Sequence, residues 1–169
     1  MKAKQWFVIA LVIILALVPL TVLAQAEVKH CSGTETVIGL IDHGVWTFPD
    51  GNIHVRGMKS QYADNTNCPE VSGIVTTIMN ANWDSKGVGP MWGTARSETT
   101  YNGGGVWEGT WTGKTYPDGT YSYTGITKGV SGSVLGLRNR VSAHTDEPNG
   151  PTFVKIDIIV TSAYQQNNP

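Results

Sequence analysis

Residues 105–113 read Gly-Val-Trp-Glu-Gly-Thr-Trp-Thr-Gly, the clearest strand pattern in the chain. Successive side chains of a β-strand point to opposite faces, so Trp107, Gly109 and Trp111 share one face. A glycine between two large rings suits a crowded, concave interior. On the other face, Glu108 would cost several kcal/mol (~) to bury without a partner. We therefore predict that both tryptophans point into the fold and that Glu108 points to solvent.

Similar β patterns occupy most of the chain after residue 26, and no window there has the period of a helix. Two Pro-Asp-Gly sequences, at 49–51 and 117–119, are typical of hairpin turns, because proline presets φ and glycine accepts a positive φ. The polar segment 63–69 is predicted to be a loop. We predict strands at residues 34–41, 45–48, 53–56, 71–80, 91–98, 105–113, 120–127, 135–144 and 152–163. The strand at 53–56 is expected to continue over residues 58–62.

Eight or nine short strands joined by tight turns predict a single all-β domain at residues 27–164. Closing an antiparallel meander into a barrel removes its exposed edges, so we expect one β-barrel of about eight strands. A two-sheet β-sandwich is the alternative. Residues 165–169 have no apolar side chain to bury and are expected to be a disordered tail.

The first 26 residues have the pattern of a signal peptide. Lys2 and Lys4 precede an apolar run over residues 6–18, and Ala24 and Ala26 supply the small residues of a cleavage site. We predict cleavage after Ala26, with cleavage after Ala24 as the alternative. An uncleaved membrane anchor is the competing interpretation. The mature protein is therefore expected to be secreted or periplasmic, without membrane contact.

Composition excludes several classes of partner. Removing the two N-terminal lysines leaves 12 − 2 = 10 basic residues against 13 acidic ones, a net charge of −3. The charges form no run of one sign, which argues against binding nucleic acid or an anionic membrane surface. The sequence has no phosphate loop, dinucleotide fingerprint or metal motif, so no cofactor is predicted.

Cys31 and Cys68 are the only cysteines in the chain. An even number of cysteines behind a signal peptide favours a disulfide, which would stabilise the fold by about 4 kcal/mol in the chain-entropy model. A metal site including His30 is the alternative, but the spacing matches no zinc motif. We therefore predict a bond that ties the mature N-terminus to the loop before the fourth strand.

Three glycine-bounded runs, at 105–113, 119–125 and 129–136, resemble the strands of the allene oxide cyclase and dirigent-like barrels. The resemblance covers residues 91–144 and implies an eight-stranded barrel with an apolar lumen. In those families an aromatic residue is expected where this chain has Val134 and Leu135. The resemblance carries over no catalytic residue.

Two groups of side chains in this region are candidates for a functional site. The first is aromatic and could bind a flat apolar ligand or simply form the core. Its members are Trp92, Trp107, Trp111, Tyr121 and Tyr123. The second is charged, and we favour an outward face of cross-strand ion pairs over a polar lumen. Its members are Arg96, Glu98, Glu108, Arg138, Arg140 and His144.

Three functions follow as hypotheses. The aromatic density without a Ser-His-Asp or paired-carboxylate pattern favours a non-enzymatic barrel that binds an apolar or aromatic small molecule in its lumen. The family resemblance alone motivates an isomerase-like or cyclase-like enzyme. The Thr- and Asn-rich exterior motivates a surface or matrix interaction module.

Overall fold

A computed structural model describes residues 26–160 of the chain, which form nine strands and three single-turn 3-10 helices. The strands are β1 (Glu27–Asp42), β2 (Val45–Thr47), β3 (Ile53–Thr66), β4 (Gly73–Trp83), β5 (Gly89–Thr99), β6 (Gly105–Thr115), β7 (Tyr121–Gly132), β8 (Arg138–Thr145) and β9 (Thr152–Val160). The helical turns are η1 (Pro49–Gly51), η2 (Pro69–Val71) and η3 (Tyr101–Gly103). The predicted signal peptide lies outside the described residues except for Ala26, as does the predicted tail.

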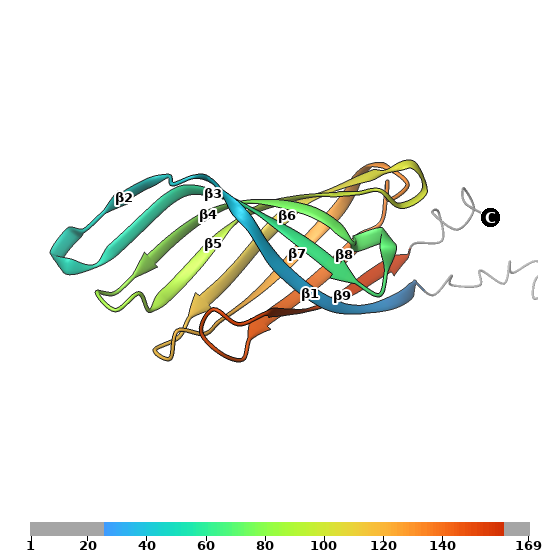
Figure 1. Ribbon diagram of the computed structural model, residues 1–169. Helices are drawn as coiled ribbons and strands as arrows, with labels where there is room; N and C mark the ends of the chain where they lie inside the picture. Colours follow the sequence, from blue (N-terminus) through green and yellow to red (C-terminus); the bar gives the residue numbers. More distant parts are fainter. Residues whose placement is uncertain (1–25, 161–169) are drawn as a thin grey trace, which may run out of the picture.

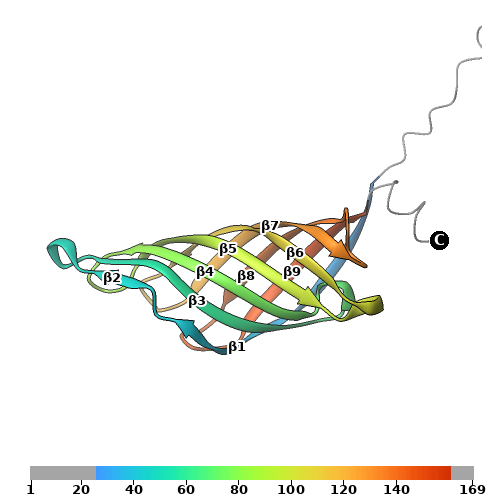
Figure 2. The same ribbon diagram turned by 90° about the horizontal axis from the view of Figure 1, so that it is seen from above.

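All strand pairs are antiparallel, in the order β1-β9-β8-β7-β6-β5-β4-β3-β2. β1 also pairs with β3, which closes eight strands into a barrel and leaves β2 outside it (Figures 1 and 2). The predicted barrel is thus confirmed and the sandwich is not formed. No helix in residues 26–160 is long and apolar enough to cross a membrane.

β1 closes the barrel because it is long enough to serve two neighbours. Its residues 27–35 pair with β9, and its residues 33–42 pair with β3. The predicted first strand, 34–41, was therefore too short at its N-terminal end. The predicted loop at 63–69 was also wrong in part, since β3 continues to Thr66. Polar residues are tolerated there because β1 and β4 satisfy the backbone of β3 from both sides.

The turn between β7 and β8 differs from the prediction of a strand starting at residue 135. The backbone N–H of Leu135 donates to Gly132, and that of Leu137 donates to Val134, so β8 begins only at Arg138. Val134 and Leu137 are buried whereas Leu135 is 60% exposed. The last predicted strand, 152–163, is present up to Val160, and the rest of it lies outside the described residues.

One end of the barrel is closed by side chains from these turns. Val71 of η2 packs in one buried cluster with Val134 and Leu137 of the β7–β8 turn and with Trp107 of β6. The predicted disulfide is confirmed in the same cluster. It joins Cys31 of β1 to the residue before η2, with 5.6 Å between the two Cα atoms.

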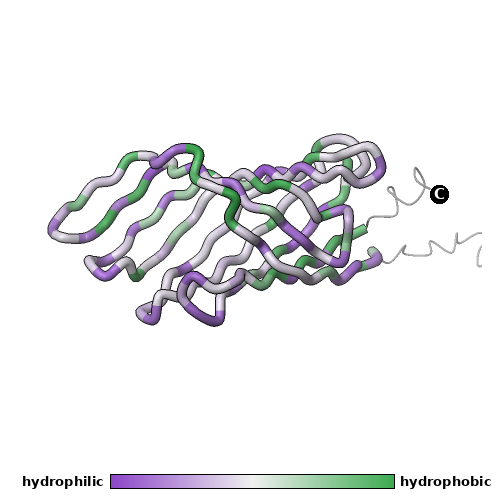
Figure 3. Tube along the Cα trace, in the orientation of Figure 1, coloured by the Kyte–Doolittle hydropathy of each residue, from purple (hydrophilic) through white to green (hydrophobic). Residues whose placement is uncertain are grey.

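The opposite end carries the β2–β3 hairpin, which extends beyond the other strands (Figure 1). A second buried cluster lies in this half, formed by Val55, Met79, Ala81 and Met91. Large apolar residues are exposed to solvent on β2 and on the C-terminal half of β1. Figure 3 shows hydrophobic residues along this part of β1. The candidate site lies between these two clusters, in the middle of the barrel.

Candidate functional site

The barrel encloses a cavity of about 330 Å³. Its wall is mainly aliphatic and aromatic, with side chains from β1, β3 to β9 and η2. At one side it reaches Val37 of β1, whose side chain lines the cavity although the residue is 65% exposed. The aliphatic part of the wall includes Val75, Met79, Met91, Val141 and Ile156.

Four of the five predicted aromatic residues, all but Trp92, line this cavity. The ring centroids of Trp111 and Tyr123 lie 5.8 Å apart with tilted planes. Trp92 does not line the cavity. Its neighbour Met91 is buried in the cavity wall, so the strand alternation turns Trp92 outward, where the Arg56 guanidinium lies 5.3 Å from its ring centroid.

The predicted orientation of β6 is confirmed. Trp107 is 1% exposed, and its indole Nε1–H donates to the backbone oxygen of Glu70 at 2.8 Å. Glu108 faces solvent and accepts a hydrogen bond from Arg96 Nη1 at 2.5 Å. Gly109, the glycine between the two tryptophans on this face, lies so close to the β7 backbone that a Cβ atom would overlap the Ile126 carbonyl oxygen.

The charged group lies on the outside, as favoured by the sequence. Arg96 Nε also donates to Glu98, at 3.2 Å, which completes an exposed cross-strand ion network with Glu108. Arg138 and Arg140 are exposed, and His144 Nε2 lies 3.2 Å from an Asp146 carboxylate oxygen. None of these six side chains is among the described residues that line the cavity.

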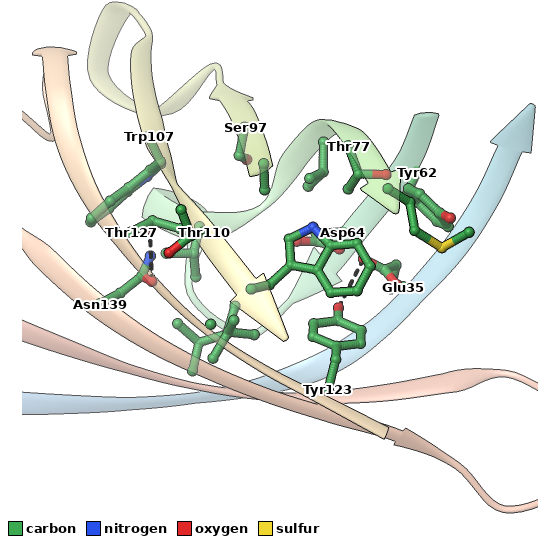
Figure 4. A pocket seen from close by; sticks show the side chains of 18 of the residues that line it. Glu35, Tyr62, Asp64, Thr77, Ser97, Trp107, Thr110, Tyr123, Thr127 and Asn139 are labelled. Carbon is green, nitrogen blue, oxygen red and sulfur yellow. Dashed lines mark hydrogen bonds between the residues drawn. The ribbon is translucent and has the colours of Figure 1, made fainter. Parts of the chain in front are cut away.

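The acidic side chains of the lumen come instead from β1 and β3. Glu35 pairs directly with Asp64 in the β1–β3 ladder, and both line the cavity. Glu35 is 8% exposed, and Tyr123 Oη donates a hydrogen bond to its Oε2 at 3.0 Å (Figure 4). Asp64 Oδ1 is shielded from solvent and has no hydrogen-bond partner. Two carboxyl groups thus meet at the wall of an apolar space.

Burial changes the acidity of this pair. Desolvation raises the pKa of Glu35 from 4.5 to about 7, although the Tyr123 hydrogen bond opposes the shift. Desolvation, followed by the charge of Glu35, raises the pKa of Asp64 from 3.8 to about 8. Desolvation also raises the pKa of Tyr123 well above its usual value, with the neighbouring carboxylates adding to the effect. Both carboxyl groups therefore carry protons in mildly acidic solution.

Elsewhere on the wall some polar groups pair within the protein, whereas the buried indole Nε1–H of Trp83 has no hydrogen-bond partner. Thr127 Oγ1 donates to Asn139 Oδ1 at 2.8 Å (Figure 4), and Asn139 is buried. The hydroxyl groups of Tyr121 and Thr152 lie 2.5 Å apart. Among residues 26–160, no group of three or more His, Cys, Asp or Glu side chains could hold a metal ion. The lumen therefore offers aromatic surface, a carboxyl pair and a few neutral polar groups.

The sequence analysis missed Glu35, Asp64, Tyr62 and Trp83, which all line the cavity. A signal for the first two was present. If a disulfide joins two antiparallel neighbours at positions 31 and 68, paired positions sum to 99, and residue 35 then meets residue 64. The even spacing from Cys31 also places Glu35 on the face of the disulfide.

Comparison with protein-family models, with curated proteins and with solved structures found no match for this chain. The resemblance of residues 91–144 to the allene oxide cyclase and dirigent-like barrels therefore stays a hypothesis.

Proposed function

We propose that the protein is an exported β-barrel that binds a small, largely apolar or aromatic molecule in its lumen. The observation that carries the proposal is the cavity of about 330 Å³ with its aliphatic and aromatic wall. Protein interiors are normally packed with few voids larger than a water molecule, and ligand pockets of a few hundred Å³ are typically apolar with a small number of polar groups. The carboxyl pair supplies such groups.

The proposal of export has two supports. The N-terminal segment has the pattern of a signal peptide. The Cys31–Cys68 disulfide is of a kind that persists in oxidising compartments and is rare in the cytosol. A binding barrel outside the cytoplasm would meet its ligand in the medium or the cell envelope.

Fluorescence titration tests binding, because Trp83, Trp107 and Trp111 line the cavity. The neutral aromatic probe N-phenyl-1-naphthylamine should quench tryptophan emission and gain emission of its own. Ala95→Phe places a ring in the lumen and should weaken binding at least tenfold. Thr94→Phe is the matched control, since residue 94 precedes Ala95 on β5 and faces solvent.

The titration has two clear outcomes. Binding that is lost in Ala95→Phe and retained in Thr94→Phe supports a lumenal site. Absence of saturable binding, or equal binding by the two variants, would show that the cavity is not the binding site and would remove the proposal.

A second candidate function is an isomerase-like or cyclase-like enzyme. The observation in its favour is the pair formed by Glu35 and Asp64, because carboxyl groups with a raised pKa can donate a proton near neutral pH. Such an enzyme would convert its bound ligand into an isomer. Mass and chromatographic analysis of the ligand before and after incubation tests this, and Glu35→Gln should bind the ligand but leave it unchanged.

A further inference from the structure

The charge of the cavity wall is one-sided. Two carboxyl groups, those of Glu35 and Asp64, line the cavity, whereas none of the lining residues among those described is Lys, Arg or His. The other titratable groups that face the pair are the phenols of Tyr62 on β3 and of Tyr121 and Tyr123 on β7. Once the pair is ionised, an anionic ligand such as a fatty acid would meet only like charge, so the lumen disfavours it above about pH 8.

The pair is also incompletely satisfied. Asp64 Oδ1 lacks a partner, and the only side-chain hydrogen bond described for Glu35 comes from Tyr123. Two like charges directly opposite on neighbouring strands are unfavourable unless a cation or a proton is shared with them. Any positively charged ligand group would relieve the repulsion, and a protonated amine would also donate a hydrogen bond to Asp64 Oδ1.

Aromatic rings complete the surroundings. Trp83, Trp111, Tyr121 and Tyr123 line the same cavity, and ring faces attract a cation that lies within about 6 Å of them. A quaternary or protonated amine on an apolar body would thus contact aromatic faces around its charge and apolar wall with the rest of the molecule.

We infer that the ligand of the lumen is a hydrophobic cation, whose charged nitrogen lies against Glu35 and Asp64. This inference rests on the proposed function and narrows the class of ligand. Binding must ionise the pair, so affinity for a permanent cation rises with pH. The expected gain is about tenfold per pH unit, for each carboxyl group that loses its proton, up to about pH 7 to 8.

The experiment compares benzyltrimethylammonium with neopentylbenzene, its neutral isostere, as competitors of N-phenyl-1-naphthylamine. At pH 8.5 the cation should bind at least tenfold more tightly than the isostere, and at pH 5 it should not. Glu35→Gln and Asp64→Asn should each reduce the cation preference at least tenfold and leave the isostere unaffected. Glu108→Gln is the control, because it removes a negative charge from the outer surface. Its cation preference should equal that of the parent protein.

The isostere also reports that the lumen of each variant is intact. Isostere binding without a cation preference, or cation binding that does not change with pH, overturns the inference and leaves the proposed function in place. Tighter binding at low pH would overturn the inference and indicate instead a neutral ligand that accepts hydrogen bonds from the protonated carboxyl groups. Failure of all three compounds to bind the parent protein overturns both proposals.

Discussion

Glu35 lies directly opposite Asp64 across the β1–β3 pair. The same register pairs Gly33 with Thr66, and two residues further along it reaches the disulfide of Cys31 and Cys68. The covalent bond and the acidic pair are therefore parts of one strand alignment. A slip of β1 by one residue would turn Glu35 to the outer face, and the disulfide opposes such a slip.

The acidic pair should make stability depend on pH. Both carboxyl groups have a higher pKa in the folded state than in the unfolded chain, so the folded state binds more protons between about pH 4 and 8. The stabilisation that the folded state gains from these protons is therefore fully present below about pH 4. It is lost as the pH rises through 7 to 8. Each group contributes up to about 1.4 kcal/mol per pH unit. Urea unfolding of the oxidised protein should give a lower midpoint at pH 8.5 than at pH 5.

Neutral isosteres supply the control for this prediction. Asp64→Asn and Glu35→Gln should flatten the pH dependence and raise the urea midpoint at pH 8.5. Glu108→Gln removes an acid that faces solvent in an ion pair, so it should leave the pH dependence of the urea midpoint unchanged. A parent protein that is more stable at pH 8.5 than at pH 5 would contradict the assignment of two protonated, buried carboxyl groups.

The fold could be predicted from sequence to the extent that alternation was visible. On β6, Gly109 lies between Trp107 and Trp111 on the face that they share, and this pattern predicted the inward face correctly. The same approach misjudged residues 63–66, because Asp64 belongs to a segment as polar as a loop. Its strand conformation depends on pairing with β1 and β4, which a local window does not contain.

The site was harder to predict for a related reason. Glu35 and Asp64 lie 29 residues apart and come together only when β1 crosses from β9 to β3 and closes the barrel. Aromatic residues were easier to find because a large ring in an alternating strand is a local signal for burial, and four of the five predicted rings line the cavity. The signal is not general: Trp92 points outward beside Arg56, and Trp46 and Phe153 are exposed on their strands.

The disulfide should contribute a large share of the stability. It closes a loop with a sequence separation of 37, which corresponds to about 4 kcal/mol in the chain-entropy model. The double variant Cys31→Ser, Cys68→Ser should therefore lose several kcal/mol (~) in urea unfolding. Peptide mass spectrometry of the non-reduced protein should find the two cysteines linked. Two free thiols in that sample would contradict the bond.

Neighbouring residues of β6 should differ sharply in their effect on stability. Trp107→Ala leaves a cavity beside the disulfide and removes the indole donor to Glu70, so we expect a loss of about 3–5 kcal/mol. Glu108→Ala removes only an exposed ion pair with Arg96 and should cost less than about 1 kcal/mol. Denaturant midpoints measure both, and the reverse order would mean that the register of β6 is wrong.

The last prediction concerns the turn between β6 and β7. Gly119 has φ +82, and its N–H donates to Tyr116 O at 3.0 Å. A Cβ atom there would also lie 3.2 Å from Pro148, which belongs to the neighbouring β8–β9 turn. Gly119→Val therefore combines backbone strain with a steric contact and should cost more than about 1 kcal/mol.

Two other glycines separate these two causes. Gly51, the glycine of the first Pro-Asp-Gly sequence, also has a positive φ, +79, but a Cβ atom there would contact nothing within 4 Å. Gly51→Val should therefore show the backbone strain alone. Gly39 has neither a positive φ nor a close neighbour, so Gly39→Ala should be almost neutral. If Gly119→Val unfolds at the same urea concentration as Gly39→Ala, the left-handed conformation assigned to this turn is incorrect.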